Sequence, residues 1–235
     1  MIETTKVVEE SLALLRAWPG YAPFSAVLEK FADVHAYLTG GVIRDRAREH
    51  RQPPRDFDIF LAGPSVDQAV HSLEKWGEVR KTPFGSPRWF PAETPAQYCD
   101  LVSISRFTNG LGSCGDIVDA LRQFDFTGNA LAIDVRTGEF LDPVGGLHDM
   151  RNGVMRMVVE YPDEPIAAGM TISRATVLWF RLLHYAAALQ LQMDPATREW
   201  LLQHRAHQDH LASFTALFFS PHPDYLRILS HDFPA

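Results

Sequence analysis

Strand-like and helix-like segments alternate through about the first two thirds of this 235-residue chain, and from about residue 158 only helix-like segments follow. This order constrains the fold more than any other feature, because an all-helical or all-strand chain would not produce it. It predicts an α+β fold. A first domain of strands and helices, residues 1–157, precedes a small all-helical domain, residues 158–235.

The individual elements follow from apolar spacing and from turn residues. Ser65 and Asp194 are expected N-caps, and Pro195 is expected in the first helical position after Asp194. The expected strands are 34–39, 56–63, 87–91 and 99–106 with a hairpin around 137–138, and the expected helices are 5–17, 23–33, 42–50, 65–77, 115–124, 172–191 and 194–219.

The composition argues against some classes of protein. A net charge of −7 and a pI near 5.8 are atypical of a dedicated nucleic-acid-binding protein, although five arginines between residues 44 and 55 can form a local basic stripe. Two cysteines, Cys99 and Cys114, are too few for a disulfide framework, and we expect free thiols in a reducing cytoplasm. Neither a secretion signal nor a membrane span is evident, so a cytoplasmic protein without a membrane partner is expected.

Two glycines, Gly40 and Gly41, stand between an expected strand and an Arg-rich helix. Glycines let the backbone approach an anion closely, and Arg44, one turn into the helix, offers a fork of donors to a triphosphate. Most Gly-Gly pairs are only turns, so the pair alone is weak evidence for a phosphate site.

Asp56 and Asp58 flank Phe57 in the next expected strand, and both carboxylates therefore point to the same side of it. Two like charges at that spacing repel unless a proton or a cation lies between them. Mg²⁺ prefers carboxylate oxygens that it can share with substrate phosphates. A solvated strand end is the ordinary alternative for an isolated Asp-x-Asp.

The order of four motifs resembles the class II tRNA nucleotidyltransferase (CCA-adding)/bacterial poly(A) polymerase family, within the DNA polymerase β-like nucleotidyltransferase superfamily. The resemblance covers roughly residues 35–200 and implies a polymerase β-like head, with a mixed sheet and flanking helices, followed by a helical neck. The motifs are LTGGVIRD (38–45) with DFDIF (56–60), FDFTGNALAID (124–134), FLDPVGGLHDMRNGVMRMV (140–158) and HYAAALQLQMDPAT (184–197).

The resemblance also assigns roles to residues of this chain. It places the triphosphate at the glycine motif, the catalytic Mg²⁺ ions at the Asp-x-Asp, and the nucleotide sugar near the third motif. Arg181, or else Arg174, would be the remaining neck contact to the nucleotide. The implied nucleotide-binding residues are Gly40, Gly41, Arg44, Asp45, Asp125, Asn129 and Arg181, and the implied metal ligands are Asp56 and Asp58.

The family's third carboxylate stands five residues before an arginine, a spacing that falls on Leu101 here. The nearest carboxylate is Asp100, six residues before Arg106, and a one-residue offset turns a side chain to the opposite face unless a bulge intervenes. Asp100 is the candidate for the third catalytic carboxylate.

Several family positions carry other residues. Phe124 replaces an arginine before Asp125, and Arg174, Ala175 and Leu178 align with the neck's Glu-Asp-x-x-Arg that reads the base. Loss of those hydrogen-bonding groups is expected to weaken base discrimination.

Two functions remain open from the sequence. The first is a Mg²⁺-dependent nucleotidyltransferase that moves a nucleotide from an NTP, ATP or CTP first of all, to a hydroxyl acceptor with release of pyrophosphate. The acceptor would be a weakly held RNA 3′ end, a small molecule or a protein, and a homo-oligomer or a partner chain is compatible with it. The alternative is a catalytically inactive nucleotide-binding or protein-interaction module that kept the fold.

Overall fold

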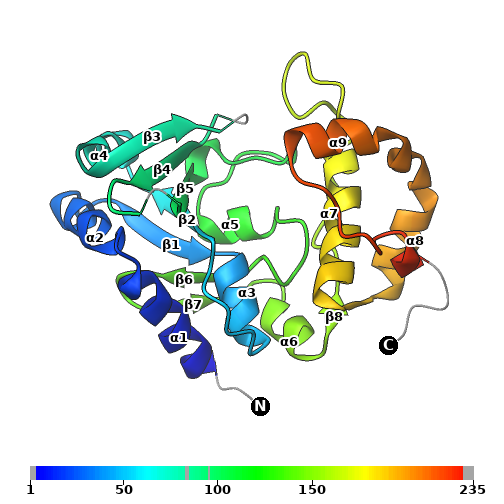
Figure 1. The fold of residues 1–235 in the computed structure, drawn as a ribbon, viewed down its shortest axis with the longest axis horizontal. Coiled ribbons are helices and arrows are strands. Elements are labelled where there is room, and N and C mark those ends of the chain that lie inside the picture. The colour runs from blue at the N-terminus through cyan, green and yellow to red at the C-terminus, as the bar shows by residue number, and fades with distance from the viewer. Residues whose placement is uncertain (1–3, 83–84, 95, 230–235) are drawn as a thin grey trace. The chain divides into compact units, whose positions relative to one another are not determined.

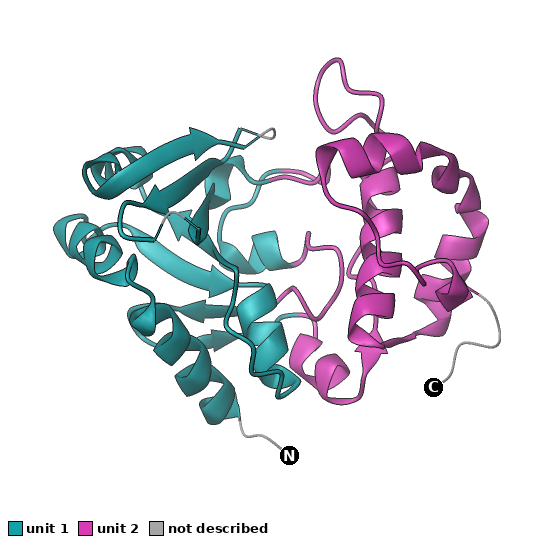
Figure 2. Ribbon diagram, viewed as in Figure 1, with its two compact units in different colours: residues 1–107, 113–121, 131–143 teal, residues 108–112, 122–130, 144–235 magenta. Residues whose placement is uncertain are grey.

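The computed structural model describes residues 4–82, 85–94 and 96–229, and these divide into two compact units. Unit 1 comprises residues 1–107, 113–121 and 131–143, and unit 2 comprises residues 108–112, 122–130 and 144–235 (Figure 2). Figure 1 shows the order of helices and strands along the chain. No helix among the described residues is long and apolar enough to cross a membrane.

Unit 1 is built on one seven-stranded sheet in the order β3-β4-β5-β2-β1-β6-β7. Neighbouring strands are antiparallel except β2 and β5, which are parallel, so the predicted mixed sheet is confirmed. The strands are β1 (His35–Thr39), β2 (Asp56–Ala62), β3 (Gly77–Lys81), β4 (Pro87–Pro91), β5 (Tyr98–Ser103), β6 (Ala132–Asp134) and β7 (Phe140–Leu141).

Helices accompany this sheet in the same unit. Helix α1 contacts α2 and α3, and α2 contacts α4. Ser65 precedes α4 as predicted, but its side chain makes no capping hydrogen bond. The helices are α1 (Thr4–Ala17), α2 (Tyr21–Lys30), α3 (Gly41–Ala47), α4 (Val66–Leu73) and α5 (Ile117–Leu121), with short 3-10 turns η1 (Glu74–Trp76) and η2 (Ile104–Arg106).

The central strand β2 separates an apolar face from a polar one. Phe57 and Ile59 are buried on one side, and Phe57 packs 5.1 Å from the ring of Trp18. Asp56 and Asp58, which alternate with them, are only half-buried on the other side. The alternation follows from the period of two along a strand, and it leaves the two carboxylates on one face of the sheet.

Unit 2 is organised around α7 (Arg174–Leu189), whose residues Trp179, Phe180 and Leu183 are fully buried. Asp194 caps α8 by accepting from the backbone N–H of Thr197, with Pro195 in the first turn, as predicted. The remaining elements are α6 (Gly146–Arg151), β8 (Val154–Met155), β9 (Gln192–Met193), α8 (Pro195–Gln203), η3 (Arg205–His210), α9 (Leu211–Leu217) and η4 (Arg227–Leu229).

Two expectations from the sequence differ from this arrangement. The region after residue 158 is not purely helical, because β9 forms a two-stranded parallel pair with β8. The border between the compact units also differs from the predicted domain border at 157 and 158. Segments 108–112, 122–130 and 144–157 belong to unit 2, although they lie within the predicted first domain.

Candidate active site

One row of side chains crosses four strands of the unit 1 sheet. In the strand register Asp58 of β2 is paired with Thr39 on β1 and with Asp100 on β5, and Asp100 is paired with Arg88 on β4. Residues paired across neighbouring strands project to the same face. Asp58 and Asp100 therefore stand side by side, on strands separated by about 4.8 Å.

The structure shows which of the two neighbouring positions, Asp100 or Leu101, lies on the same face as Asp58. Leu101 has the family spacing from Arg106, but it is fully buried on the opposite face of β5. Asp100 is half-buried and paired with Asp58 in a register that contains no bulge along β2 and β5. The sheet brings Asp100, and not Leu101, to the carboxylate face.

Both oxygens of Asp100 accept hydrogen bonds from Arg88. The Arg88 Nε lies 2.6 Å from Asp100 Oδ1, and Nη2 lies 2.8 Å from Oδ2. The guanidinium also lies 4.0 Å from the ring centroid of Tyr98. The hydrogen bond with Asp100, partly opposed by burial, raises the pKa of Arg88 above its ordinary value, so its positive charge is secure.

Asp56, which is paired with Tyr98 across β2 and β5, accepts hydrogen bonds from two neighbouring side chains. The hydroxyl of Tyr98 donates to Asp56 Oδ2 at 2.7 Å, and the exposed Arg55 approaches the same oxygen at 3.3 Å. Burial, together with the hydrogen bond and charge of Asp56, raises the pKa of Tyr98 to about 12. Tyr98 is therefore a neutral hydrogen-bond donor to Asp56 at physiological pH.

Gly40 lies directly against Asp58. Its φ is +71°, which favours glycine, and a Cβ added there would come 3.2 Å from Asp58 Oδ2. The glycine turn therefore lies close to the carboxylate strand. A larger residue at position 40 would press on the Asp58 carboxylate.

Arg44 is folded toward the turn that precedes it. A Cβ at Gly41 would lie 3.5 Å from Arg44 Nη2, and the buried guanidinium holds Asp45 Oδ1 at 2.9 and 3.0 Å. Burial, followed by the nearby charge of Arg44, lowers the pKa of Arg48. Gly40, Gly41 and Arg44 thus gather at one end of α3, and Asp45 orients Arg44.

The predicted sugar-binding residues lie in unit 2, in a buried cluster. Asp125 accepts from Arg181 Nε at 2.8 Å, from the Asn129 amide at 3.0 Å and from the backbone N–H of Phe126 at 2.9 Å. Burial by itself would lower the pKa of Arg181, but the charge of Asp125, with smaller effects of Tyr185 and Tyr161, raises it above its ordinary value. The three residues tie the 122–130 segment to α7, and a role in nucleotide binding stays a prediction.

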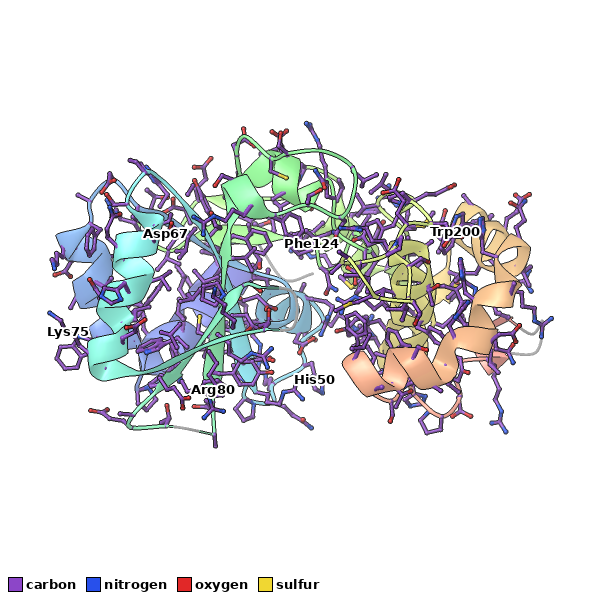
Figure 3. All side chains as sticks on the ribbon, turned by 90° about the horizontal axis from the view of Figure 1, so that it is seen from above. His50, Asp67, Lys75, Arg80, Phe124 and Trp200 are labelled. Atoms are coloured by element: carbon purple, nitrogen blue, oxygen red, sulfur yellow. The ribbon has the colours of Figure 1, made fainter. Side chains whose placement is uncertain are left out.

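The base-reading positions of the neck also lie in unit 2. Ala175 and Leu178 are buried in α7, and Arg174 Nη1 donates to the carbonyl oxygen of Pro165 at 2.5 Å. Phe124, labelled in Figure 3, belongs to the 122–130 segment of the same unit. Apolar side chains thus stand at two of the aligned base-reading positions.

Comparison with known proteins shows to which family this chain belongs. Residues 95–156 match the poly A polymerase head domain family. Over 172 residues the chain is 33% identical to a multifunctional CCA protein of Xanthomonas euvesicatoria pv. vesicatoria. The chain belongs to the class II CCA-adding enzyme and poly(A) polymerase family.

Solved structures of CCA-adding enzymes share the fold. The Thermotoga maritima CCA-adding enzyme complexed with tRNA aligns over 89% of this chain and 47% of its own, with a TM-score of 0.63 and 20% identity. A CCA-adding enzyme with CTP covers 88% of this chain and 47% of its own, with a TM-score of 0.61 and 19% identity. The alignment with the Xanthomonas protein covers 67% of this chain and 39% of that protein, so the chain spans less than half the length of these relatives.

The family implies a Mg²⁺ ion, and the carboxylate oxygens of this face can be compared with the ligands that Mg²⁺ prefers. Asp56 and Asp58 offer hard oxygen ligands on one face beside Gly40, which suits an ion shared with phosphate oxygens. Among the described residues no group of three or more His, Cys, Asp or Glu side chains is arranged to hold a metal ion, and both Asp100 oxygens bond to Arg88. By their chemistry the oxygens of Asp56 and Asp58 fit a metal ion, whereas both oxygens of Asp100 are engaged by Arg88, and the metal-binding and catalytic roles of the three residues stay predictions.

Arg88 and Tyr98 are site residues that the sequence did not indicate. Period-two alternation along 98–101 places Tyr98 and Asp100 on one face, and this signal was available. Which strand lies beside β5, and in which register, comes only from the folded sheet. The pairing of Arg88 with Asp100 depends on that register.

Proposed function

We propose that the chain is a Mg²⁺-dependent nucleotidyltransferase that transfers a nucleotide from an NTP to an RNA 3′ hydroxyl and releases pyrophosphate. The observation that supports it most is the placement of the Asp58 carboxylate against Gly40 in a family of CCA-adding proteins. A backbone turn suited to phosphate and a pair of metal-binding carboxylates meet at one point of one sheet. The Thermotoga maritima CCA-adding enzyme, which shares the fold, is complexed with tRNA, and this favours an RNA 3′ end as the acceptor.

Each residue of the site has a specific part in this proposal. Asp56 and Asp58 would hold the metal, with the Tyr98 hydroxyl orienting Asp56. Gly40 and Gly41 would admit the triphosphate close to the backbone, and Arg44, held by Asp45, would donate to its oxygens. When bound, Mg²⁺ supplies activation of the attacking hydroxyl and charge stabilisation on the phosphates. The side chains of this chain thus contribute position and charge, the main needs of phosphoryl transfer.

Base selection is expected to be relaxed. Ala175 and Leu178 are apolar and buried where the family's base-reading groups align, and an apolar side chain cannot hydrogen-bond a base edge. ATP and CTP are the expected substrates, with less discrimination between them than a strict C-then-A programme needs.

Nucleotide binding tests the proposal without knowledge of the acceptor. We expect thermal unfolding with ATP or CTP plus Mg²⁺ to shift upward, since a ligand at a hundred times its dissociation constant adds about 2.7 kcal/mol. The shift should vanish in the Asp56→Asn/Asp58→Asn variant and persist in an Asp67→Asn control, which changes an exposed carboxylate of α4 (Figure 3).

Incorporation of labelled nucleotide into a short RNA with a free 3′ hydroxyl then tests transfer itself. A Mg²⁺-dependent shift with no incorporation into RNA would leave nucleotide binding and remove RNA as the acceptor. No shift with any of the four NTPs would refute the enzyme and favour the inactive module.

A further inference from the structure

Three charged side chains lie in a line across β2, β5 and β4. Asp58 is paired in register with Asp100, and Asp100 is paired with Arg88. Two carboxylates on neighbouring strands repel each other unless a positive charge compensates them. In this chain the compensating charge next to Asp100 is a guanidinium.

Arg88 is held in place from two sides. Its Nε and Nη2 make a bidentate pair with Asp100 at 2.6 and 2.8 Å, the geometry that fixes an arginine most firmly on a carboxylate. Its guanidinium also lies 4.0 Å from the centroid of Tyr98, whose hydroxyl is bonded to Asp56. The arginine is therefore part of the same network as the carboxylate face.

A metal ion at Asp100 would have to compete with this arginine. Both carboxylate oxygens already accept a charge-assisted hydrogen bond, so an ion would have to displace the guanidinium or share each oxygen with it. Sharing places a divalent cation beside a fixed positive charge, which is unfavourable. Mg²⁺ commonly uses only one or two protein carboxylates and completes its coordination with phosphates and water.

We propose that Arg88 serves as a built-in cation at Asp100, so that the carboxylate face binds one divalent ion, through Asp56 and Asp58, when a nucleotide is present. The inference rests on the proposed function, because it presupposes a metal and nucleotide site on this face. Arg88 is a positioning residue here. It neutralises Asp100 and thereby sets how many ions the face accepts.

The number of bound ions tests the proposal directly. Mn²⁺ is titrated into the protein with saturating α,β-methylene-ATP or α,β-methylene-CTP, and bound Mn²⁺ per chain is counted by electron paramagnetic resonance. We expect one ion in the wild type, one in Arg88→Lys, which keeps the charge, and two in Arg88→Met, which frees Asp100. Arg80→Met is the matched control and should bind one, since Arg80 is an exposed arginine at the sheet edge on β3 that pairs with Glu78 (Figure 3).

The outcomes separate this inference from the proposed function. Two ions in the wild type, or one ion in Arg88→Met, would overturn the role of Arg88 and leave the nucleotidyltransferase standing. No nucleotide-dependent Mn²⁺ in the wild type would refute the proposed function, and the inference with it. If Arg88→Met does not fold, the wild-type count decides, because a second ion there is incompatible with the proposal.

Discussion

Replacement of Arg181 by methionine should destabilise the protein more than most single substitutions. The Asp125 side chain is only 4% exposed, and Arg181 is its charged partner at 2.8 Å. Without Arg181 the carboxylate keeps only the neutral donors of Asn129 and Phe126. Breaking a buried ion pair in this way costs about 3–5 kcal/mol. We expect a loss of about 3 kcal/mol, at the low end of this range. The Arg181 side chain is 28% exposed, so water can partly hydrate the Asp125 carboxylate once Arg181 is removed.

A double-mutant cycle measures this coupling. Arg181→Met, Asp125→Asn and the double variant are compared with the wild type by urea unfolding, followed by tryptophan fluorescence, to which Trp179 and Trp200 of unit 2 contribute. Arg181→Met leaves the Asp125 carboxylate buried without its charged partner, and the double variant removes that charge as well. The double variant should therefore lose less stability than the sum of the two single variants, by about 2 kcal/mol. The exposed Arg205→Met variant in the same unit is the control and should stay within about 0.5 kcal/mol of the wild type.

Two results would refute the reasoning. If Arg181→Met loses less than about 1 kcal/mol, the carboxylate is solvated in solution and the pair is not a buried one. If the losses of the single variants simply add, Asp125 and Arg181 do not stabilise each other, whatever each contributes alone.

Three further predictions concern unit 1. The raised pKa of Tyr98 adds stability that is complete below pH 10 and is lost as the pH rises toward about 12. Between about pH 9 and pH 11, the free energy of unfolding measured in urea should therefore fall less in Tyr98→Phe than in the wild type. An equal loss in both proteins would contradict the raised pKa of Tyr98. Gly40→Ala should lose about 1–3 kcal/mol, because φ is +71° and the new Cβ meets Asp58, and an unchanged midpoint of thermal unfolding would exclude this turn geometry. Burial, followed by the charge of Asp58, raises the pKa of Cys99 well above its ordinary value, so Cys99 should resist alkylation at neutral pH in native protein and react in urea; rapid native labelling would disprove its burial.

Local patterns were sufficient for much of the fold. The Asp194-Pro195 cap of α8, the helical spacing of α7 and the strand β2 with its two outward carboxylates depend on residues near one another in the chain. These features were predicted correctly because caps and apolar periodicity act over a few residues. Strand β3 was missed, because Gly77–Lys81 is mostly polar and three of its five residues are exposed at the sheet edge.

The register between strands that are distant in the sequence could not be predicted from the sequence. Spacing along the chain placed Leu101 at the family position, whereas pairing between β2 and β5 brings Asp100 beside Asp58. The Arg88 partner of Asp100 likewise follows from the alignment of β4 with β5. The division into units depends on contacts such as Asp125 with Arg181, 56 residues apart.

The sequence by itself therefore determined most of the helices and strands, the family motifs and the two carboxylates of β2. Only the tertiary structure decided which carboxylate stands beside Asp58 and which arginine pairs with that carboxylate. The physical reason is that propensity and periodicity are properties of neighbouring residues, while strand register and buried charge pairs are set by the packing of the whole sheet and core.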